Sequence, residues 1–282
     1  MNDIIDIHPH VLSDDQAAYP LAPLGGNVSG WASTRPVTAE QLLAAMDETG
    51  IAKAALVQAS TAYGYDNSYV LDSAARYPDR FAVVACADPL APAAAHSVLE
   101  LARHPRLAGI RLFTTGSTMP GQAQWLNDAK TAPFWAAAAE AGTPVCVQMK
   151  LAGKDQLIDV LERFRAVRIV LDHMAYPPIA PGQERAAAEQ LIPLAKYPQL
   201  YLKMTVRNTE PLAAGCDAQE FLGPLLDTFG SGRIAWGSNF PAAEQPLDTL
   251  VGLARTVLAK VRDDDRAAIL SGTARSLYAA LS

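Results

Sequence analysis

The chain has few of the residues that mark specialised classes of protein. It contains only 5 histidines and 3 cysteines in 282 residues. Cys86, Cys146 and Cys216 are odd in number and far apart, and none belongs to a Cys-x-x-Cys pair, so we expect buried, reduced thiols. The chain has no long basic run, and 23 basic against 29 acidic residues leave a net charge of -6. Nucleic-acid binding, which needs clustered cations, is therefore not expected.

Long apolar segments are also missing. No stretch approaches the roughly 20 apolar residues that cross a bilayer, and the amino terminus has neither the basic region nor the apolar centre of a signal peptide. These features predict a cytoplasmic protein without a membrane partner. Hydrophobic residues still make up 50% of the chain, which is enough for a large core. The length allows two domains, or one α/β barrel of about 250 residues.

Short apolar runs alternate with longer amphipathic ones along the chain. The apolar runs predict parallel strands that are covered on both faces, at residues 4–8, 54–59, 81–87, 109–113, 144–149, 168–172, 200–204 and 233–237. The amphipathic runs predict helices at residues 39–49, 69–77, 93–104, 132–141, 155–165, 184–196 and 218–229. Thr38 is expected to cap the first of these helices, and Gly50 and Gly142 stand where helices end with glycine.

This order of elements predicts an α/β fold, a (β/α)₈ TIM barrel that forms a single domain over residues 1–282. A doubly wound open sheet is the main competitor, but it usually carries a glycine-rich turn after its first strand. Here that turn reads His8-Pro9-His10. The long segments 11–37 and 114–131 are expected to lie at the C-terminal mouth of the barrel, where substrates bind.

Three of the five histidines stand at predicted strand ends. His8 and His10 are two residues apart, so their side chains can point to the same side and converge on a metal ion or on a substrate carbonyl and its water. His173 follows the sixth strand at the same face of the barrel. The alternative for the pair is a surface loop, and for His173 a buried histidine without a chemical role. His96 and His104 fall on a predicted surface helix and are expected to be solvated.

Polar residues near other strand ends are candidates for substrate binding. Arg111 lies inside an apolar strand, where an unpaired guanidinium is costly, so it needs either a protein carboxylate or a substrate carboxylate held in two hydrogen bonds. Asn239 follows the eighth strand and joins the histidines as a candidate catalytic residue. The remaining candidates for the substrate-binding mouth are Gln58, Ser60, Tyr65, Asn67, Gln148, Lys203 and Arg207.

Several motifs, in this order, resemble the amidohydrolase superfamily, in its amidohydrolase-related (family 2) branch. They are Ile5-Asp6-Ile7-His8-Pro9-His10, Gly109-Ile110-Arg111-Leu112, Leu171-Asp172-His173-Met174, Trp236-Gly237-Ser238-Asn239-Phe240-Pro241 and Gly272-Thr273-Ala274-Arg275-Ser276-Leu277-Tyr278. Within the branch the chain looks most like the lactonases, such as 2-pyrone-4,6-dicarboxylate lactonase, which share Val57-Gln58-Ala59-Ser60 and Asp66-Asn67. The resemblance implies hydrolysis at the barrel mouth. Carried over, His8, His10 and His173 act on the carbonyl, and Arg111 and Arg207 hold an anion.

The chain departs from the family pattern at two positions. Gln148 stands where metal-dependent members have a histidine, and a neutral amide is a poor ligand for a transition metal. Asn239 replaces the aspartate that the resemblance would make the base, and an amide cannot act as a general base. Three explanations remain for Asn239: an engineered Asp-to-Asn variant that traps substrate, a natural member that uses His173 as base, or a catalytically silent binder.

We therefore expect a hydrolase that opens a small anionic lactone without a cofactor, with His8, His10 and His173 stabilising the oxyanion and residue 239 orienting water. One alternative is a metal-dependent hydrolase, decarboxylase or hydratase with one divalent ion such as zinc. The other is a non-catalytic ligand-binding barrel. The sequence does not identify the lactone, and a homodimer is the commonest oligomer among such proteins.

Overall fold

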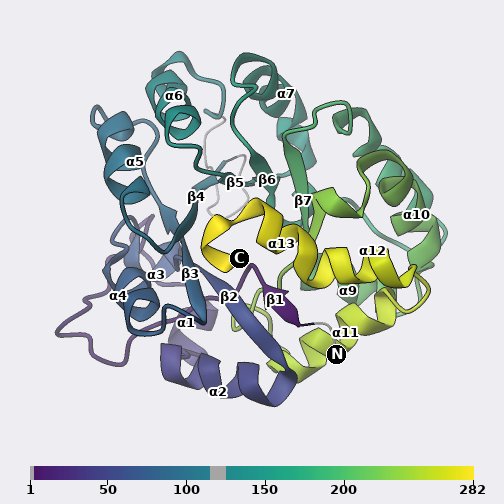
Figure 1. Cartoon of the computed structure of the whole chain (residues 1–282), viewed down its shortest axis with the longest axis horizontal. Helices are drawn as coiled ribbons and strands as arrows, with labels where there is room; N and C mark the ends of the chain where they lie inside the picture. Colours follow the sequence, from purple (N-terminus) through teal and green to yellow (C-terminus); the bar gives the residue numbers. More distant parts are fainter. Residues whose placement is uncertain (1–2, 115–124) are drawn as a thin grey trace.

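Eight parallel strands form one sheet, in which each strand lies beside the next in chain order (Figure 1). The computed structural model describes residues 3–114 and 125–282. The strands are β1 (Ile4–Asp6), β2 (Ile51–Val57), β3 (Phe81–Cys86), β4 (Leu107–Phe113), β5 (Val145–Gln148), β6 (Ile169–Leu171), β7 (Leu200–Met204) and β8 (Ile234–Trp236). Hydrogen bonds also join the end of β1 to the end of β8, from Ile7 N to Trp236 O (3.3 Å) and from Asn239 N to His8 O (3.0 Å). The predicted (β/α)₈ barrel is thus confirmed.

Helices surround the sheet in Figure 1, as the amphipathic runs predict. Their bounds are α1 (Gly30–Thr34), α2 (Ala39–Thr49), α3 (Ser60–Tyr63), α4 (Ser68–Arg76), α5 (Ala94–Ala102), α6 (Ala132–Glu140), α7 (Lys154–Arg163), α8 (Glu184–Glu189), α9 (Val206–Ala213), α10 (Ala218–Phe229), α11 (Leu247–Val257), α12 (Asp263–Ala267) and α13 (Thr273–Leu277). The helix expected over residues 184–196 is shorter, because α8 ends at Glu189 and a 3₁₀ turn containing Pro193 follows. In the described part of the chain, no helix is both long and apolar enough to cross a membrane.

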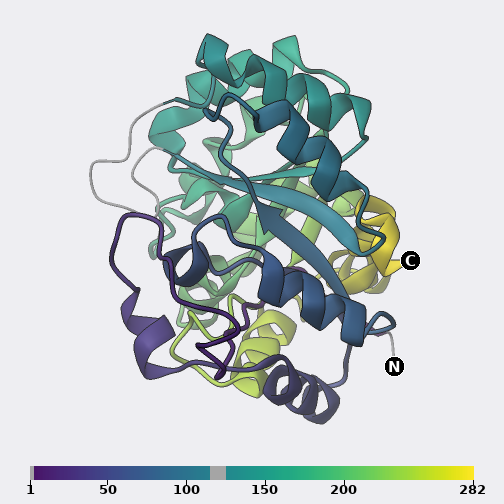
Figure 2. The same cartoon turned by 90° about the vertical axis from the view of Figure 1, so that its left-hand side faces the viewer.

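The two ends of the barrel differ. The C-terminal segment closes the end at which the strands begin: Tyr278 and Leu281 pack with Ile5 and Val170 inside the barrel, and Lys53, at the start of β2, donates to the carbonyl of Leu281. Residues 11–37 lie at the opposite end: in Figure 2 this purple loop is on the left and the yellow C-terminal segment is on the right. The C-terminal ends of the strands are therefore the end where a site can form.

Six strands end one or two residues earlier than the sequence predicts, and a histidine follows two of these strands, β1 and β6. β1 ends at Asp6 and not at residue 8, because the Asp6 carboxylate takes over from the strand ladder: its Oδ1 accepts hydrogen bonds from the backbone N–H groups of His8 (2.9 Å) and Ser238 (2.8 Å). β6 ends at Leu171, after which the backbone turns away from the strand conformation. His8 and His173 therefore extend from turns just beyond the sheet.

Candidate active site

A cavity of about 260 Å³ opens at the C-terminal mouth of the barrel. Its volume suits a small molecule. Seven of the residues proposed from the sequence line it: His10, Ser60, Arg111, Gln148, His173, Arg207 and Asn239. The wall also contains Ser29, Trp31, Ala59, Thr61, Tyr176 and Ala242. Two arginines and no carboxylate stand among these described lining residues, so the cavity favours an anion.

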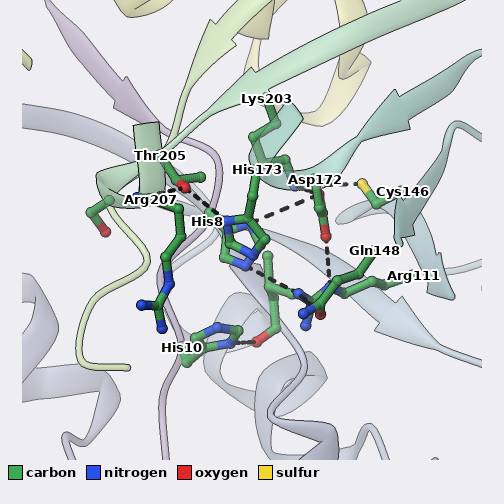
Figure 3. Close-up of polar contacts among 12 residues, drawn as sticks. His8, His10, Arg111, Cys146, Gln148, Asp172, His173, Lys203, Thr205 and Arg207 are labelled. Atoms are coloured by element: carbon green, nitrogen blue, oxygen red, sulfur yellow. Dashed lines mark hydrogen bonds and ion pairs between the residues drawn. The ribbon is translucent and has the colours of Figure 1, made fainter. Parts of the chain in front are cut away.

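The three histidines form one cluster, with His8 in the centre (Figure 3). The ring centroid of His8 is 5.1 Å from that of His10 and 4.9 Å from that of His173. His8 is fully buried behind the cavity, whereas His10 and His173 reach its wall. On the cavity side, His10 stacks against Trp31 with centroids 5.3 Å apart.

Hydrogen bonds and burial define the state of the histidines. Burial, together with the nearby charge of Arg111, lowers the pKa of His10 to about 3. Burial likewise lowers the pKa of His173 to about 3, although the Asp172 carboxylate opposes the shift, and burial and nearby Lys203 lower the pKa of His8. All three imidazoles are therefore neutral near pH 7. A carbonyl can only accept, so the His10 Nδ1 carries the hydrogen that it donates to Val57 O (2.8 Å). Its Nε2 then keeps a lone pair, to which no group in the described part of the chain is hydrogen-bonded.

Asp172 is a buried carboxylate that contacts both Arg111 and Lys203. It was not among the site residues proposed from the sequence. Its Oδ2 accepts a hydrogen bond from Arg111 Nε at 2.8 Å, and its Oδ1 lies 2.7 Å from Lys203 Nζ (Figure 3). Burial alone would raise the pKa of Asp172, but the charges of Lys203 and Arg111 outweigh that effect and lower it. Lys203 and Arg111 thus share the Asp172 carboxylate, and the buried Asp6 carboxyl group also interacts with the charge of Lys203. Arg111 thus has a protein carboxylate as partner and still reaches the cavity.

The guanidinium group of Arg111 lies beside His8 and Gln148, the positions at which a metal ion would have to bind. Arg111 Nη2 donates a hydrogen bond to Gln148 Oε1 and lies 3.4 Å from His8 Nε2. A metal ion bound to these atoms would meet the positive charge of Arg111, and Gln148 and Asn239 offer only neutral amides where a histidine and a carboxylate would be preferred. No group of three or more histidine, cysteine or acidic residues within residues 3–114 and 125–282 is arranged to hold a metal. The residues present do not fit a divalent ion.

Asn239 follows β8, where that strand meets the end of β1, and its side chain lies at the cavity. Its φ of 66° lies in the left-handed region, where asparagine is tolerated better than most residues. No hydrogen bond of its side-chain amide is found among the described residues, so the amide is free to hold a water molecule or a substrate. Nearby, a Cβ atom at Gly237 would lie 2.6 Å from the Cβ of His8. Only glycine lets β8 approach the histidine cluster so closely.

A rare backbone conformation follows β6. His173, Met174, Ala175 and Tyr176 all have positive φ, between 52° and 59°. Consecutive left-handed residues other than glycine are strained, and here the strain places both His173 and Tyr176 on the cavity wall. Asn208 helps to hold this turn, since its Nδ2 donates to the His173 carbonyl at 3.1 Å. The sequence pattern gave no signal for Tyr176, because a left-handed turn has no hydrophobic period.

Four of the proposed substrate-binding residues lie away from the cavity. Lys203 is fully buried inside the barrel against Asp172. Asn67 exchanges two hydrogen bonds with the backbone of Cys86, at 2.7 and 2.9 Å. Gln58 is buried and donates to the carbonyl of Asp66, and Tyr65 is 40% exposed on the outer surface. Of the loop expected over residues 114–131, residues 115–124 lie outside the described part of the chain.

The buried histidines predict that the protein loses stability in acid. His10 and His173 have a pKa of about 3 in the folded chain, against 6.5 for a free side chain. Between these pH values the unfolded chain binds more protons than the folded one, so the free energy of unfolding should fall as the pH drops from 6.5 toward 3. Urea unfolding across this range measures it. A free energy of unfolding that stays constant would contradict the neutral, buried state of these rings.

Comparison with known proteins agrees with the motifs. L-Fucono-1,5-lactonase of Burkholderia ambifaria is 29% identical over 210 residues, which cover 74% of this chain and 70% of that protein. A putative 2-pyrone-4,6-dicarboxylic acid hydrolase from Pseudomonas putida has a similar structure, with a TM-score of 0.78 and 23% identity over 99% of this chain and 98% of that one. An amidohydrolase from Burkholderia multivorans with bound zinc gives a TM-score of 0.75 and 23% identity over 98% and 99%. At this identity, the two structures show a shared fold.

The assignment to a family rests on the sequence as a whole. The model of the amidohydrolase family matches residues 5–280. The match includes the two histidines after β1, Asp172 and His173 after β6, and Asn239 after β8. The chain therefore belongs to the amidohydrolase family.

Proposed function

We propose that this protein hydrolyses a small anionic lactone at the mouth of the barrel. The observation that carries the proposal is the cavity itself, where neutral histidines and a free asparagine amide lie beside two guanidinium groups. The neutral rings can act on an ester carbonyl and its water, and the arginines favour a substrate with a carboxylate. The named activities of the Burkholderia ambifaria and Pseudomonas putida relatives, a lactonase and a pyrone dicarboxylic acid hydrolase, support this substrate class.

The hydrogen bonds favour different roles for the three histidines. Thr205 Oγ1 accepts from the Arg207 N–H and lies 2.7 Å from His173 Nδ1, so its own hydrogen can go to that nitrogen. His173 would then present an Nε2–H group that stabilises the oxyanion formed when water attacks the carbonyl. His10 has a bare Nε2 and is suited to accept a hydrogen bond from the attacking water.

His8 has a different environment, because its Nε2 faces Arg111 and not the cavity. We assign to it the positioning of Arg111 and of the neighbouring rings. This division of roles is narrower than the expectation that all three histidines stabilise the oxyanion. With these roles, His10 activates the water, although its low pKa makes it a weak base, and Asn239 orients that water.

The substrate and metal requirement can be tested together. Protein treated with a chelator should hydrolyse a carboxylate-bearing lactone, and should do so with a higher kcat/KM than the matched methyl ester, because Arg111 and Arg207 favour an anion and the donor set does not fit a metal. Ring opening is measured by proton release, and metal content by elemental analysis. About one equivalent of zinc or manganese, together with activity that disappears on chelation, would contradict the proposal and favour a metal-dependent hydrolase, decarboxylase or hydratase.

A non-catalytic binding barrel is the second candidate, and Asn239 is the observation that favours it. The cavity would then keep its affinity for anions but lack a group basic enough to activate water. Binding of a carboxylate-bearing lactone without ring opening, in both the native chain and an Asn239→Asp variant, would support this candidate over the lactonase.

A further inference from the structure

One glutamine amide connects Arg111 to Tyr176 on the cavity wall. A guanidinium group can only donate, so the Oε1 atom of Gln148 must face Arg111 and accept its hydrogen bond. The Nε2 atom of Gln148 then faces Tyr176 and donates to its hydroxyl oxygen at 2.7 Å. Arg111 therefore sets the direction of these hydrogen bonds, from Arg111 through Gln148 to Tyr176. The Nε of Arg111 is itself held by Asp172.

This direction determines what the Tyr176 hydroxyl can do. Its oxygen accepts from Gln148, so its own hydrogen must go to another acceptor. Within residues 3–114 and 125–282, no other polar group is hydrogen-bonded to this hydroxyl. The His173 ring is close, with centroids 4.9 Å apart, but it offers no acceptor here if its Nε2 carries the hydrogen. The Tyr176 O–H group is therefore a donor available at the cavity wall.

The surroundings indicate which kind of acceptor fits. Arg111 and Tyr176 contact the same side-chain amide, so one ligand group can reach both. Arg111 shares its carboxylate partner, Asp172, with Lys203, so a bound anion would add a further negative group beside the guanidinium. The left-handed turn fixes Tyr176 in this place.

We propose that Tyr176 is a substrate-binding residue that donates its hydroxyl hydrogen to the same substrate carboxylate that Arg111 holds, with its direction set by Gln148. The inference rests on the proposed lactonase function for the identity of the substrate. The subsite itself would bind simple carboxylates whether or not the chain is a lactonase. Tyr176 would act in binding and not in the chemical step, because the carboxylate has the same charge in the ground state and in the transition state.

The first test is Tyr176→Phe, which removes only the hydroxyl and keeps the ring. A hydrogen bond to a charged group predicts that the KM for a carboxylate-bearing lactone and the Kd for succinate both rise roughly 10- to 100-fold, with kcat little changed. Tyr197→Phe is the matched control, since its hydroxyl donates to Glu162 (2.8 Å) outside the cavity. An unchanged KM and Kd in Tyr176→Phe would overturn the proposal, as would a fall in kcat with unchanged affinity.

The second test examines whether Gln148 sets the direction of the hydrogen bond to Tyr176. In a Gln148→Glu variant, the new carboxylate accepts from Arg111 and also from the Tyr176 hydroxyl, which no longer faces the ligand. Adding Tyr176→Phe to this variant should then change succinate affinity less than about twofold. If Tyr176→Phe costs as much in both backgrounds, Gln148 does not set the direction and the proposal is wrong. Succinate binding needs no turnover, so it separates a failed subsite from a failed lactonase assignment.

Discussion

Replacing Asn239 with aspartate should raise the turnover of an anionic lactone at least about tenfold. The side chain of residue 239 lies at the cavity wall, beside His10 and His173. The asparagine amide can orient water but cannot take its proton, and the pKa of about 3 makes the nearby His10 a weak base. A carboxylate in the same place supplies the missing base. The kcat of the native and variant proteins on the same lactone measures the effect.

Asn127→Asp is the matched control for that variant. It makes the same chemical change at a residue that does not line the cavity and whose backbone carbonyl accepts from Arg163, and it should leave kcat unchanged. If the Asn239→Asp variant is no faster than the native chain on its best substrate, residue 239 is not in the position of a general base. The mechanism would then have to pass through His10 or His173 alone.

Replacing Asp172 with asparagine should destabilise the protein by about 3–5 kcal/mol, the usual cost of leaving a buried charge without its partner. Asp172 is the carboxylate that contacts both Lys203 (2.7 Å) and Arg111 (2.8 Å), and all three side chains are buried. Without it, Lys203 and Arg111 lose the carboxylate that pairs with both of them. The free energy of unfolding in urea near neutral pH measures the loss.

Two further variants test that explanation. Adding Lys203→Met to Asp172→Asn removes one of the two unbalanced cations and should restore part of the lost stability. Asp159→Asn breaks an exposed ion pair with Arg163 (3.0 Å) and should change stability far less, because water screens that pair. If Asp172→Asn is no more destabilising than Asp159→Asn, the buried cluster does not hold the site together.

The barrel could be predicted because its signals are local. Helix α2 begins and ends at the predicted residues, since Thr38 and Gln41 form a capping box and Gly50 adopts the left-handed conformation (φ 77°) that ends a helix. Strand β7 also has its predicted bounds, because Leu200–Met204 is apolar except for Lys203. Helix α11 was not predicted from the sequence, and Pro246 at its start makes no side-chain hydrogen bond.

The site was less predictable, because its centre depends on contacts between distant strands. The partner of Arg111 was open from the sequence, and it is Asp172, 61 residues away. Lys203, placed at the mouth from its position near a strand end, lies instead against the same carboxylate. A lysine inside an apolar strand was itself a signal for a buried partner. No comparable signal existed for Tyr176, whose position depends on a left-handed turn.

Lactone hydrolysis in solution tests the central claim most directly. The native chain and its Asn239→Asp variant, both treated with chelator, should be assayed for ring opening on a panel of carboxylate-bearing lactones. The account predicts that at least one lactone is opened by both proteins, and faster by the variant. If neither protein opens any anionic lactone of the panel, the chain is not a lactonase and the cavity serves binding alone.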